Sequence, residues 1–318
     1  MYSIPGDNYI DFRLQKYAEY CGEKLRHNDG DFYPLKLLCR SNDPNERVWV
    51  SFLYSTCYSA QTTALLLRVF PNIESAEEQR LKDFWKTYKD KLIFQSDRRY
   101  VKIMDKFVPI VISYKSKIGN NQQIDILQSL MKKSQADVYN WFSSIYYCGR
   151  FSTLLFLEAI YDLLEYGTLS YEEYLDWGSC KTCAQGICVI CYNDKLADEL
   201  HDRAPIKQEI IWLESMLKAI IQYTESYLGI ALNFVDAVGY CCGYFKLYKG
   251  TRYLEFYTDR RLEELRYYQK QLPEYNDLWD KLFQIRFERV PHEILGELNG
   301  WNGIRKERLK RFLTYGTF

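Results

Sequence analysis

The chain has 318 residues, enough for one large or two ordinary domains and for a substantial buried core. Lysine plus arginine and aspartate plus glutamate both number 42, so no global positive field draws the protein onto nucleic acid, and a polyanion would need a local basic patch. No window reaches eighteen apolar residues and the N-terminal sequence lacks the apolar core of a signal peptide, which leads us to expect a soluble protein of the cytoplasm.

Cysteine and tyrosine are both frequent. The ten cysteines lie in a long chain without secretory features, so we expect most of them to be reduced. The 29 tyrosines have two interpretations. Tyrosine supplies flat apolar area for stacking on bases, but an AT-rich genome also raises its frequency.

The first third of the chain has helical periodicity. An amphipathic helix is predicted over 8–27, and a second helix over 48–71 follows a capping segment with Pro44 in its first turn. The second helix is apolar on most faces and is therefore expected to be buried. Small hydroxyl side chains between Ser51 and Thr62 interrupt it, which fits either close helix packing or a polar stripe facing a cavity.

A further amphipathic helix is predicted over 77–92. The next segment opens with Ser96 and Asp97 at a capping position, followed by Arg98 and Arg99. Basic residues in a first helical turn oppose the helix macrodipole. Arg98 and Arg99 are therefore expected to have another partner, either a nearby carboxylate or a bound anion.

The middle of the chain continues the pattern with short helices over 122–133 and 135–148 and an apolar helix over 151–165. Glu158 lies in that apolar helix. A carboxylate there must pair or shift its pKa, so Glu158 is either the partner of an arginine or a general base.

Four cysteines at 180, 183, 188 and 191 form the pattern C-x2-C-x4-C-x2-C. Two such knuckles are typical of a closed, structural tetrathiolate zinc site. The pattern predicts a Cys-rich insert at about 178–193 that holds zinc through Cys180, Cys183, Cys188 and Cys191. Free thiols and, less favoured, an iron–sulfur cluster are the alternatives.

Helices also dominate the last third, with predicted segments over 206–221, 228–248, 262–272 and 278–285 and a basic helix at the end of the chain. Strand patterns are nearly absent and glycine plus proline are few. The sequence therefore predicts an all-α protein, formed by one helical catalytic domain over 1–318.

The segment 246–261, KLYKGTRYLEFYTDRR, is the strongest candidate site. Lys246, Lys249, Arg252, Arg260 and Arg261 lie close together between two apolar helices, and an anionic leaving group or a phosphate backbone requires several converging donors. A solvated corner between two helices, with its aromatic residues packed inward, explains the pattern equally well.

Common catalytic motifs are missing. The sequence has no Walker A motif, no dinucleotide-binding glycine motif after a strand, no nucleophile elbow and no zincin motif. His27 and His201 lie in polar surroundings and His292 lies at a predicted helix start, so a histidine-based catalytic triad is not predicted.

Four segments together resemble a phage family, the amino acid:DNA transferases, also called α-glutamyl/putrescinyl-thymine pyrophosphorylases, of the second clade. They are WVSFLYSTCYSAQTTALLLRVFP at 49–71, FQSDRRY at 94–100, DAVGYCCGYFKLYKGTRYLEFYTDRRLEEL at 236–265, and LGELNGW at 295–301 with its basic tail. The tetracysteine segment is not a feature of that family, so a metal there would be peculiar to this branch.

The resemblance implies a fold like that of helical DNA glycosylases and an enzyme of the host cytoplasm during phage infection. Its implied substrates are DNA with pyrophosphorylated 5-hydroxymethyluracil and an amino acid or polyamine whose amine displaces pyrophosphate. Such a reaction needs a flipped base, stabilisation of the departing pyrophosphate and removal of a proton from the amine. A divalent metal on the pyrophosphate would suit this chemistry but has no sequence signature here.

The residues that the resemblance assigns to these tasks fall into two groups. Asp259, Glu297 and Asp97 would orient or deprotonate the amine, and Arg252 would act on the leaving pyrophosphate. The pyrophosphate and DNA ligands would be Lys246, Lys249, Arg260, Arg98, Tyr253, Tyr257 and Trp301. Asp259 and Arg260 have a second interpretation as an internal ion pair.

Two other functions stay open on the sequence alone. A helical base-processing enzyme such as a glycosylase would activate water in place of an amine. A noncatalytic DNA-binding phage protein would use the tyrosine and arginine clusters only to grip a strand.

Overall fold

The computed structural model describes residues 12–27, 30–39, 42–94, 106–164, 177–178, 180–232, 234–252, 254 and 256–289. These residues form helices and the turns between them, with no strand in the described ranges, so the all-α prediction is confirmed. No helix in these ranges has both the length and the apolar character needed to cross a membrane.

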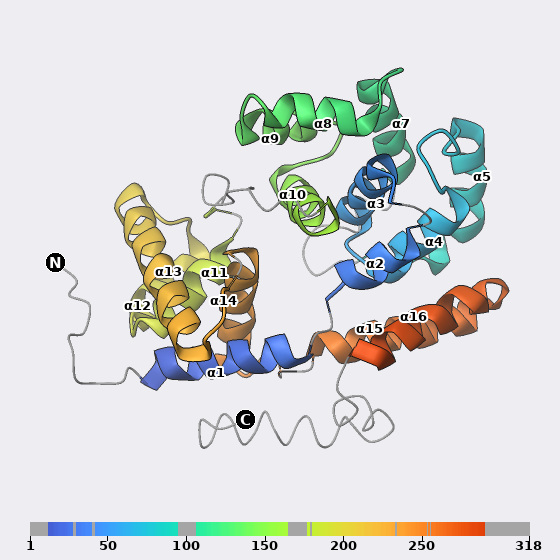
Figure 1. The fold of residues 1–318 in the computed structure, drawn as a ribbon. Helices are drawn as coiled ribbons and strands as arrows, with labels where there is room; N and C mark the ends of the chain where they lie inside the picture. Colours follow the sequence, from blue (N-terminus) through green and yellow to red (C-terminus); the bar gives the residue numbers. More distant parts are fainter. Residues whose placement is uncertain are drawn as a thin grey trace. The chain divides into compact units, whose positions relative to one another are not determined.

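Figure 1 labels the helices in chain order. They are α1 (Phe12–His27), α2 (Phe32–Leu38), α3 (Pro44–Cys57), α4 (Ala60–Val69), α5 (Glu78–Tyr88), η1 (Lys89–Lys91), α7 (Phe107–Ile118), α8 (Gln123–Met131), α9 (Gln135–Ser143), α10 (Arg150–Leu164), α11 (Lys181–Ile190), α12 (Asp194–Asp202), α13 (Lys207–Leu228), α14 (Phe234–Tyr248), α15 (Phe256–Gln271), η3 (Pro273–Tyr275) and α16 (Asn276–Arg289).

The chain divides into two compact units, which we describe separately. Unit 1 comprises Met1–Asn28, Leu175–Asp259 and Arg289–Phe318, and unit 2 comprises Asp29–Tyr174 and Arg260–Glu288. The boundary falls inside α15, between Asp259 and Arg260. That the whole chain acts as one catalytic domain stays a prediction.

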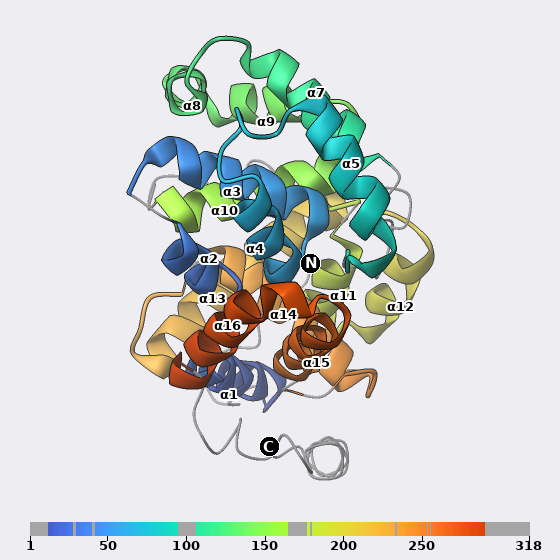
Figure 2. The ribbon, with the colours of Figure 1, turned by 90° about the vertical axis from the view of Figure 1, so that its right-hand side faces the viewer.

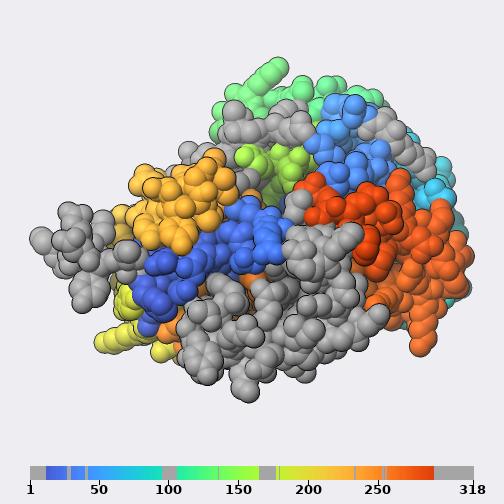
Figure 3. All heavy atoms as spheres, turned by 60° about the horizontal axis from the view of Figure 1, so that its bottom comes forward, coloured from blue at the N-terminus to red at the C-terminus, as the bar shows by residue number. Residues whose placement is uncertain are grey.

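Unit 1 is built around α11, whose residues Thr182–Ile190 are all buried. This helix packs against α1, α12, α13 and α14. Its closest approach is at Gly186, where a Cβ atom would lie 2.2 Å from the Cys241 carbonyl oxygen of α14. The packing therefore requires glycine at this position. In Figure 3, α1 (blue) lies beside α13 (gold) at the surface of this unit.

In unit 2 the central helix is α3, which packs against α4, α8 and α10. Asp43 caps α3 by accepting a hydrogen bond from the Asn45 N–H, and Pro44 lies in its first turn, as the sequence predicts. Phe52 stacks on Tyr114 of α7 with ring centroids 3.8 Å apart. Figure 2 shows α5 beside α7 in this unit.

The predicted single helix over 48–71 is wrong in one respect, because it is broken into α3 and α4. Tyr58 adopts a left-handed conformation with φ 48°, and Ser59 is extended and begins α4. The Ser59 side chain accepts a hydrogen bond from the Thr62 N–H and so caps the new helix. This break lies at the centre of the site described next.

Candidate functional site

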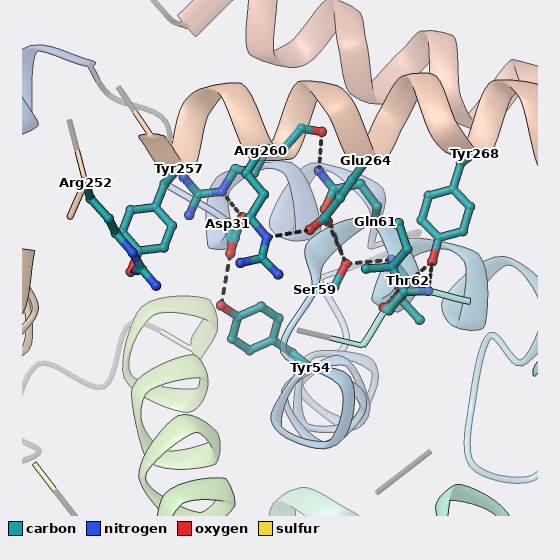
Figure 4. A network of polar contacts seen from close by, with 12 residues as sticks. Asp31, Tyr54, Ser59, Gln61, Thr62, Arg252, Tyr257, Arg260, Glu264 and Tyr268 are labelled. Atoms are coloured by element: carbon teal, nitrogen blue, oxygen red, sulfur yellow. Dashed lines mark hydrogen bonds and ion pairs between the residues drawn. The ribbon is translucent and has the colours of Figure 1, made fainter. Parts of the chain in front are cut away.

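The joint between α3 and α4 gathers polar side chains inside unit 2. Ser55, Thr56, Ser59, Gln61, Thr62 and Thr63 are all buried there. Several of these hydroxyls bond only to their own helix backbone, as Ser55 and Thr56 do one turn back. Ser59, Gln61 and Thr62 instead reach the neighbouring helix α15 and its surroundings (Figure 4).

Glu264 of α15 is the buried carboxyl group that Ser59 meets. The Ser59 hydroxyl donates to Glu264 Oε2 at 3.2 Å, and the Glu264 residue is only 5% exposed. Burial raises the pKa of the Glu264 carboxyl to about 7, and the charge of Asp31 adds to the rise, while Arg260 acts in the opposite direction. Arg260 Nε lies 3.4 Å from the other oxygen, Oε1, which accepts no hydrogen bond from the described residues.

Asp31 is the second buried carboxyl group of this site. Arg261 Nε donates to Asp31 Oδ1 at 2.6 Å, and Arg286 Nη2 donates to the same oxygen at 3.2 Å. The Tyr54 hydroxyl donates to the other oxygen, Oδ2, at 3.1 Å. Burial opposes ionisation, but the two guanidinium groups outweigh it and lower the pKa of Asp31 below its usual value. Asp31 is therefore ionised near neutral pH, and its single negative charge is shared between Arg261 and Arg286.

Tyr268, one turn after Glu264 on α15, closes the other end of the network. Its hydroxyl lies 2.6 Å from Thr62 Oγ1 and accepts a hydrogen bond from the Ile93 N–H at 2.7 Å. Burial raises the pKa of the Tyr268 phenol, so it stays protonated. Gln61 Nε2 donates to the Arg261 carbonyl oxygen at 3.2 Å and ties α4 to the same turn of α15.

This arrangement suits proton transfer beside an anion site. A carboxyl group with a pKa of about 7 exists in both protonation states near neutral pH, so it can accept and return a proton. Arg260 is half-buried, and its guanidinium provides positive charge next to that carboxyl. Asp31 has the opposite character, because two arginines lower its pKa and keep it ionised near neutral pH.

The sequence placed Arg260 among the candidate ligands, and it lies in this network. Asp259, its neighbour, is the last residue of this part of unit 1 and is 1% exposed. Arg260 pairs with Glu264 at 3.4 Å, and the internal ion pair between Asp259 and Arg260 stays a prediction.

The other candidates of the segment 246–261 lie in unit 1. Arg252 donates a hydrogen bond to the Tyr257 hydroxyl, and its guanidinium carbon lies 4.7 Å from the Phe256 ring centroid and 5.1 Å from that of Tyr257. Lys249 forms an exposed ion pair with Asp198 at 3.2 Å. Lys246 lies in the last turn of α14, and its carbonyl oxygen accepts from the Thr251 N–H and hydroxyl.

Five predicted site residues, Asp97, Arg98, Tyr253, Glu297 and Trp301, lie outside the described residues. The sequence pattern also predicts that the segment 246–261 lines a cleft beside residues 51–62, 97–99 and 295–301. Because 97–99 and 295–301 lie outside the described residues, this cleft stays a prediction. Within unit 2, only the meeting of Arg260 and Arg261 with the α3–α4 joint is visible.

The four cysteines do not have the geometry of a zinc site. In place of a loop with two knuckles, they lie along α11, with Cys180 just before it, Cys183 and Cys188 buried within it and Cys191 just after it. At about 1.5 Å per helical residue, the first and last of them are roughly 16 Å apart along the axis. In the described ranges no group of three or more cysteine, histidine or acidic side chains could hold a metal ion.

These cysteines are instead part of the packing of unit 1. Burial and hydrogen bonds with Cys241 and Cys242 raise the pKa of the Cys183 thiol, with the hydrogen bonds having the larger effect. Burial also raises the pKa of the Cys188 thiol above its usual value. Both thiols are therefore protonated at neutral pH and are poor nucleophiles.

Sequence reasoning missed Glu264 and Asp31. Glu264 follows Glu263, and only the helical period distinguishes the two, because Glu264 shares a face with Arg260 and Tyr268 whereas Glu263 is exposed. Asp31 lies in a short turn before α2, and its two arginine partners are more than 200 residues away in the sequence. No local sequence pattern predicts such a pairing.

Comparisons with known proteins agree with one another. A family model described as amino acid:DNA transferase matches residues 27–250. A protein of Salmonella phage ViI named Serinyltransferase is 25% identical over 291 residues, which cover 83% of this chain and 69% of the relative. No solved structure matches the chain. The family match includes Asp31 and Ser59 and ends before Arg252, Arg260 and Glu264.

Proposed function

Because this chain belongs to the amino acid:DNA transferase family, we propose that it modifies bacteriophage DNA by attaching an amine to pyrophosphorylated 5-hydroxymethyluracil. The amine comes from an amino acid or a polyamine. The similarity to a phage protein named Serinyltransferase supports an amino acid as the donor and a phage as the setting.

The reaction is a substitution at the methylene carbon of the modified base. The amine nitrogen forms a bond to this carbon, and the bond from the carbon to the pyrophosphate oxygen breaks. Pyrophosphate leaves with the electron pair of that bond. The nitrogen, which begins as an ammonium group, gives up one proton before the attack and a second proton after it.

The proposal depends on one observation, the raised pKa of the buried Glu264 carboxyl group. Its pKa of about 7 makes it a better proton acceptor for an ammonium group than an ordinary carboxylate, since proton transfer improves as the two pKa values approach each other. Its Oε1 atom is buried and accepts no hydrogen bond from the described residues, so it has an unused lone pair for an amine that enters the site. Arg260, 3.4 Å away, would stabilise negative charge on the leaving group.

The residues selected from the sequence keep proposed roles. Arg252 and Lys249 are proposed to hold phosphate oxygens, because guanidinium and ammonium groups are the usual donors to such anions. Tyr257 and Tyr253 are proposed to stack on the extruded base. Asp259, with Asp97 and Glu297, is the alternative to Glu264 as the group that orients or deprotonates the amine.

Lys246, Arg98 and Trp301 are proposed as further DNA or pyrophosphate contacts. A divalent cation on the pyrophosphate is a separate proposal, and no step of the reaction above depends on it. Omitting magnesium and adding a chelator in the assay below would test it.

The experiment uses the full chain and DNA that carries pyrophosphorylated 5-hydroxymethyluracil. The DNA is incubated with single amino acids, including serine, or with putrescine, and its nucleosides are analysed by mass spectrometry. We expect one nucleoside whose mass has gained the amine and lost pyrophosphate, with equal amounts of pyrophosphate released. Free base and abasic sites would indicate a glycosylase, and binding without turnover would indicate a noncatalytic DNA-binding protein; either result would overturn the proposal.

A further inference from the structure

A groove between α5 and α7 in unit 2 has a feature that the proposed reaction does not use. It has a volume of about 830 Å³, within the roughly 300–1,000 Å³ usual for ligand sites. Lysine side chains line it on both sides, with Lys82, Lys86 and Lys89 on α5 and η1 and Lys117 on α7. Figures 1 and 2 show the two helices side by side.

The lining between the lysines is apolar and aromatic. Val108, Pro109 and Ile112 of α7 contribute to it together with Trp85 of α5. Trp85 is held in place by stacking on Phe107, with ring centroids 5.2 Å apart. Tyr146 is 46% exposed at the same groove. Two aromatic side chains are therefore available beside the lysines without rearrangement of the core.

The charge of the groove is strongly positive. Among the described residues that line the groove, Glu78 is the one acidic residue, and it pairs with Lys82 at 2.6 Å. Lys86, Lys89 and Lys117 form no ion pair within the described parts of the chain. Lys82 and Lys86 are one helical turn apart, about 6 Å along the axis, which gives a row of charges suited to a linear polyanion.

The chain connects this groove directly to the network around Glu264. Four residues after Lys89, the Ile93 N–H donates to the Tyr268 hydroxyl, and the Thr62 hydroxyl donates to the Ile93 carbonyl oxygen. Four extended residues span at most about 14 Å. Lys89 therefore lies near Thr62 and Tyr268 of the polar network, within the same unit.

We propose that this groove binds the DNA strand next to the modified base, with unpaired bases on Trp85 and Tyr146 and phosphates on Lys86, Lys89 and Lys117. This inference rests on the proposed function, which supplies DNA as the substrate. A basic groove with aromatic residues is the usual form of a single-strand site, because every base offers a face for stacking while the phosphates follow the cations. An acidic peptide would match the charges but would leave the aromatic residues without a regular partner.

The test measures binding of unmodified DNA, so it needs no turnover. One variant combines Lys86→Ala, Lys89→Ala and Lys117→Ala, and the matched control combines Lys132→Ala, Lys133→Ala and Lys281→Ala, which are exposed lysines of the same unit outside the groove. Affinity for a fluorescent 20-nucleotide single strand and for the corresponding duplex is followed by anisotropy over a series of salt concentrations. Equal melting temperatures verify that both variants are folded.

We expect the groove variant to bind the single strand at least tenfold more weakly and the control to bind within about twofold of the unaltered protein. The slope of log affinity against log salt should become shallower by about 2, since each lost phosphate contact removes roughly 0.7 for a single strand. Tyr146→Ala should weaken single-strand binding without changing that slope. Equal losses in the groove variant and the control, or a loss for duplex alone, would overturn the inference. Absence of transferase activity in the unaltered protein would instead contradict the proposed function and leave this measurement intact.

Discussion

Ser59 Oγ donates a hydrogen bond to Glu264 Oε2 at 3.2 Å while it also accepts one from the Thr62 N–H at 3.3 Å. One hydroxyl thus begins α4 and fixes a titratable carboxyl group of α15. The helix break at Tyr58 places the Ser59 hydroxyl in this position, because in a continuous helix residue 59 would be an interior residue and would not cap α4. The capping of α4 and the chemistry proposed for Glu264 depend on the same atom.

Glu264 should make the protein less stable as pH rises. Its folded pKa of about 7 lies above the ordinary value of 4.5, so between these values the folded chain holds a proton that the unfolded chain has lost. The free energy of unfolding should therefore fall as pH rises through this window, by on the order of 3 kcal/mol in total. Glu264→Gln should remove this dependence, as followed by urea unfolding at pH 5 and pH 8.

The control for that measurement is Glu263→Gln, because Glu263 is the exposed neighbour on the same helix. It should show the pH dependence of the unaltered protein. If Glu264→Gln and Glu263→Gln have the same pH profile, Glu264 does not carry a raised pKa.

Asp31→Asn should destabilise the protein strongly. The change leaves Arg261 and the 2% exposed Arg286 without their carboxylate, and breaking a buried pair from one side costs about 3–5 kcal/mol. Asp277→Asn is the matched control, because Asp277 pairs with Arg68 at 3.2 Å on the surface and should matter by less than about 1 kcal/mol. Urea unfolding at pH 7 compares them, and equal losses would mean that the Asp31 cluster contributes no more than a surface pair.

Two glycines should respond in opposite ways to alanine. At Gly186 the added Cβ would lie 2.2 Å from a backbone oxygen of α14, so α11 and α14 must separate, and we expect a loss of about 1–3 kcal/mol or more. At Gly239, inside α14, nothing lies within 4 Å, and alanine should gain roughly 0.5–1 kcal/mol through its higher helix propensity. Thermal unfolding of Gly186→Ala and Gly239→Ala decides this, and a neutral Gly186→Ala would show that the two helices do not pack this closely.

The fold could be predicted from the sequence much further than the site could. Helical periodicity and capping residues are local signals, so α3 with its Asp43 cap and the buried α10 follow from short windows. The break at Tyr58 could not be predicted, because no glycine or proline marks it. The ion pairs of Asp31 could not be predicted either, since they join residues 230 and 255 positions apart.

The cysteine pattern misled for a related reason. Spacing of Cys180, Cys183, Cys188 and Cys191 fits two zinc knuckles as well as it fits one buried helix, and only the apolar residues between Cys183 and Cys191 favour the helix. A motif that is read without the period of its neighbours therefore predicts the wrong chemistry. In the same way, the helical period indicates that Glu264 is buried and that Glu263 is exposed.

We expect the purified protein to contain much less than one zinc per chain, because the four thiols do not converge. Treatment with a chelator should leave the melting temperature unchanged, and Cys183 and Cys188 should resist alkylation in the native state because they are buried. Elemental analysis and mass spectrometry of alkylated peptides make the measurement. One zinc per chain, with unfolding on its removal, would restore the tetrathiolate site predicted from the sequence.

Glu264→Gln and Arg252→Ala should impair the reaction in different ways. If Glu264 accepts the proton of the attacking amine, its loss should slow single-turnover release of pyrophosphate by about 10²–10⁴-fold, and the defect should shrink at higher pH because more of the amine is already unprotonated. If Arg252 holds the departing pyrophosphate, its loss should slow the same step by roughly a hundredfold or more at every pH, with DNA affinity nearly unchanged. Asp259→Asn tests the alternative assignment of Asp259 as the proton acceptor. If Asp259 has only a structural role, this substitution should lower the melting temperature and leave the rate per folded molecule unchanged. A folded Glu264→Gln protein that releases pyrophosphate at the normal rate across the pH range, beside an Asp259→Asn protein with the pH-dependent defect, would move the proton acceptor from unit 2 to Asp259.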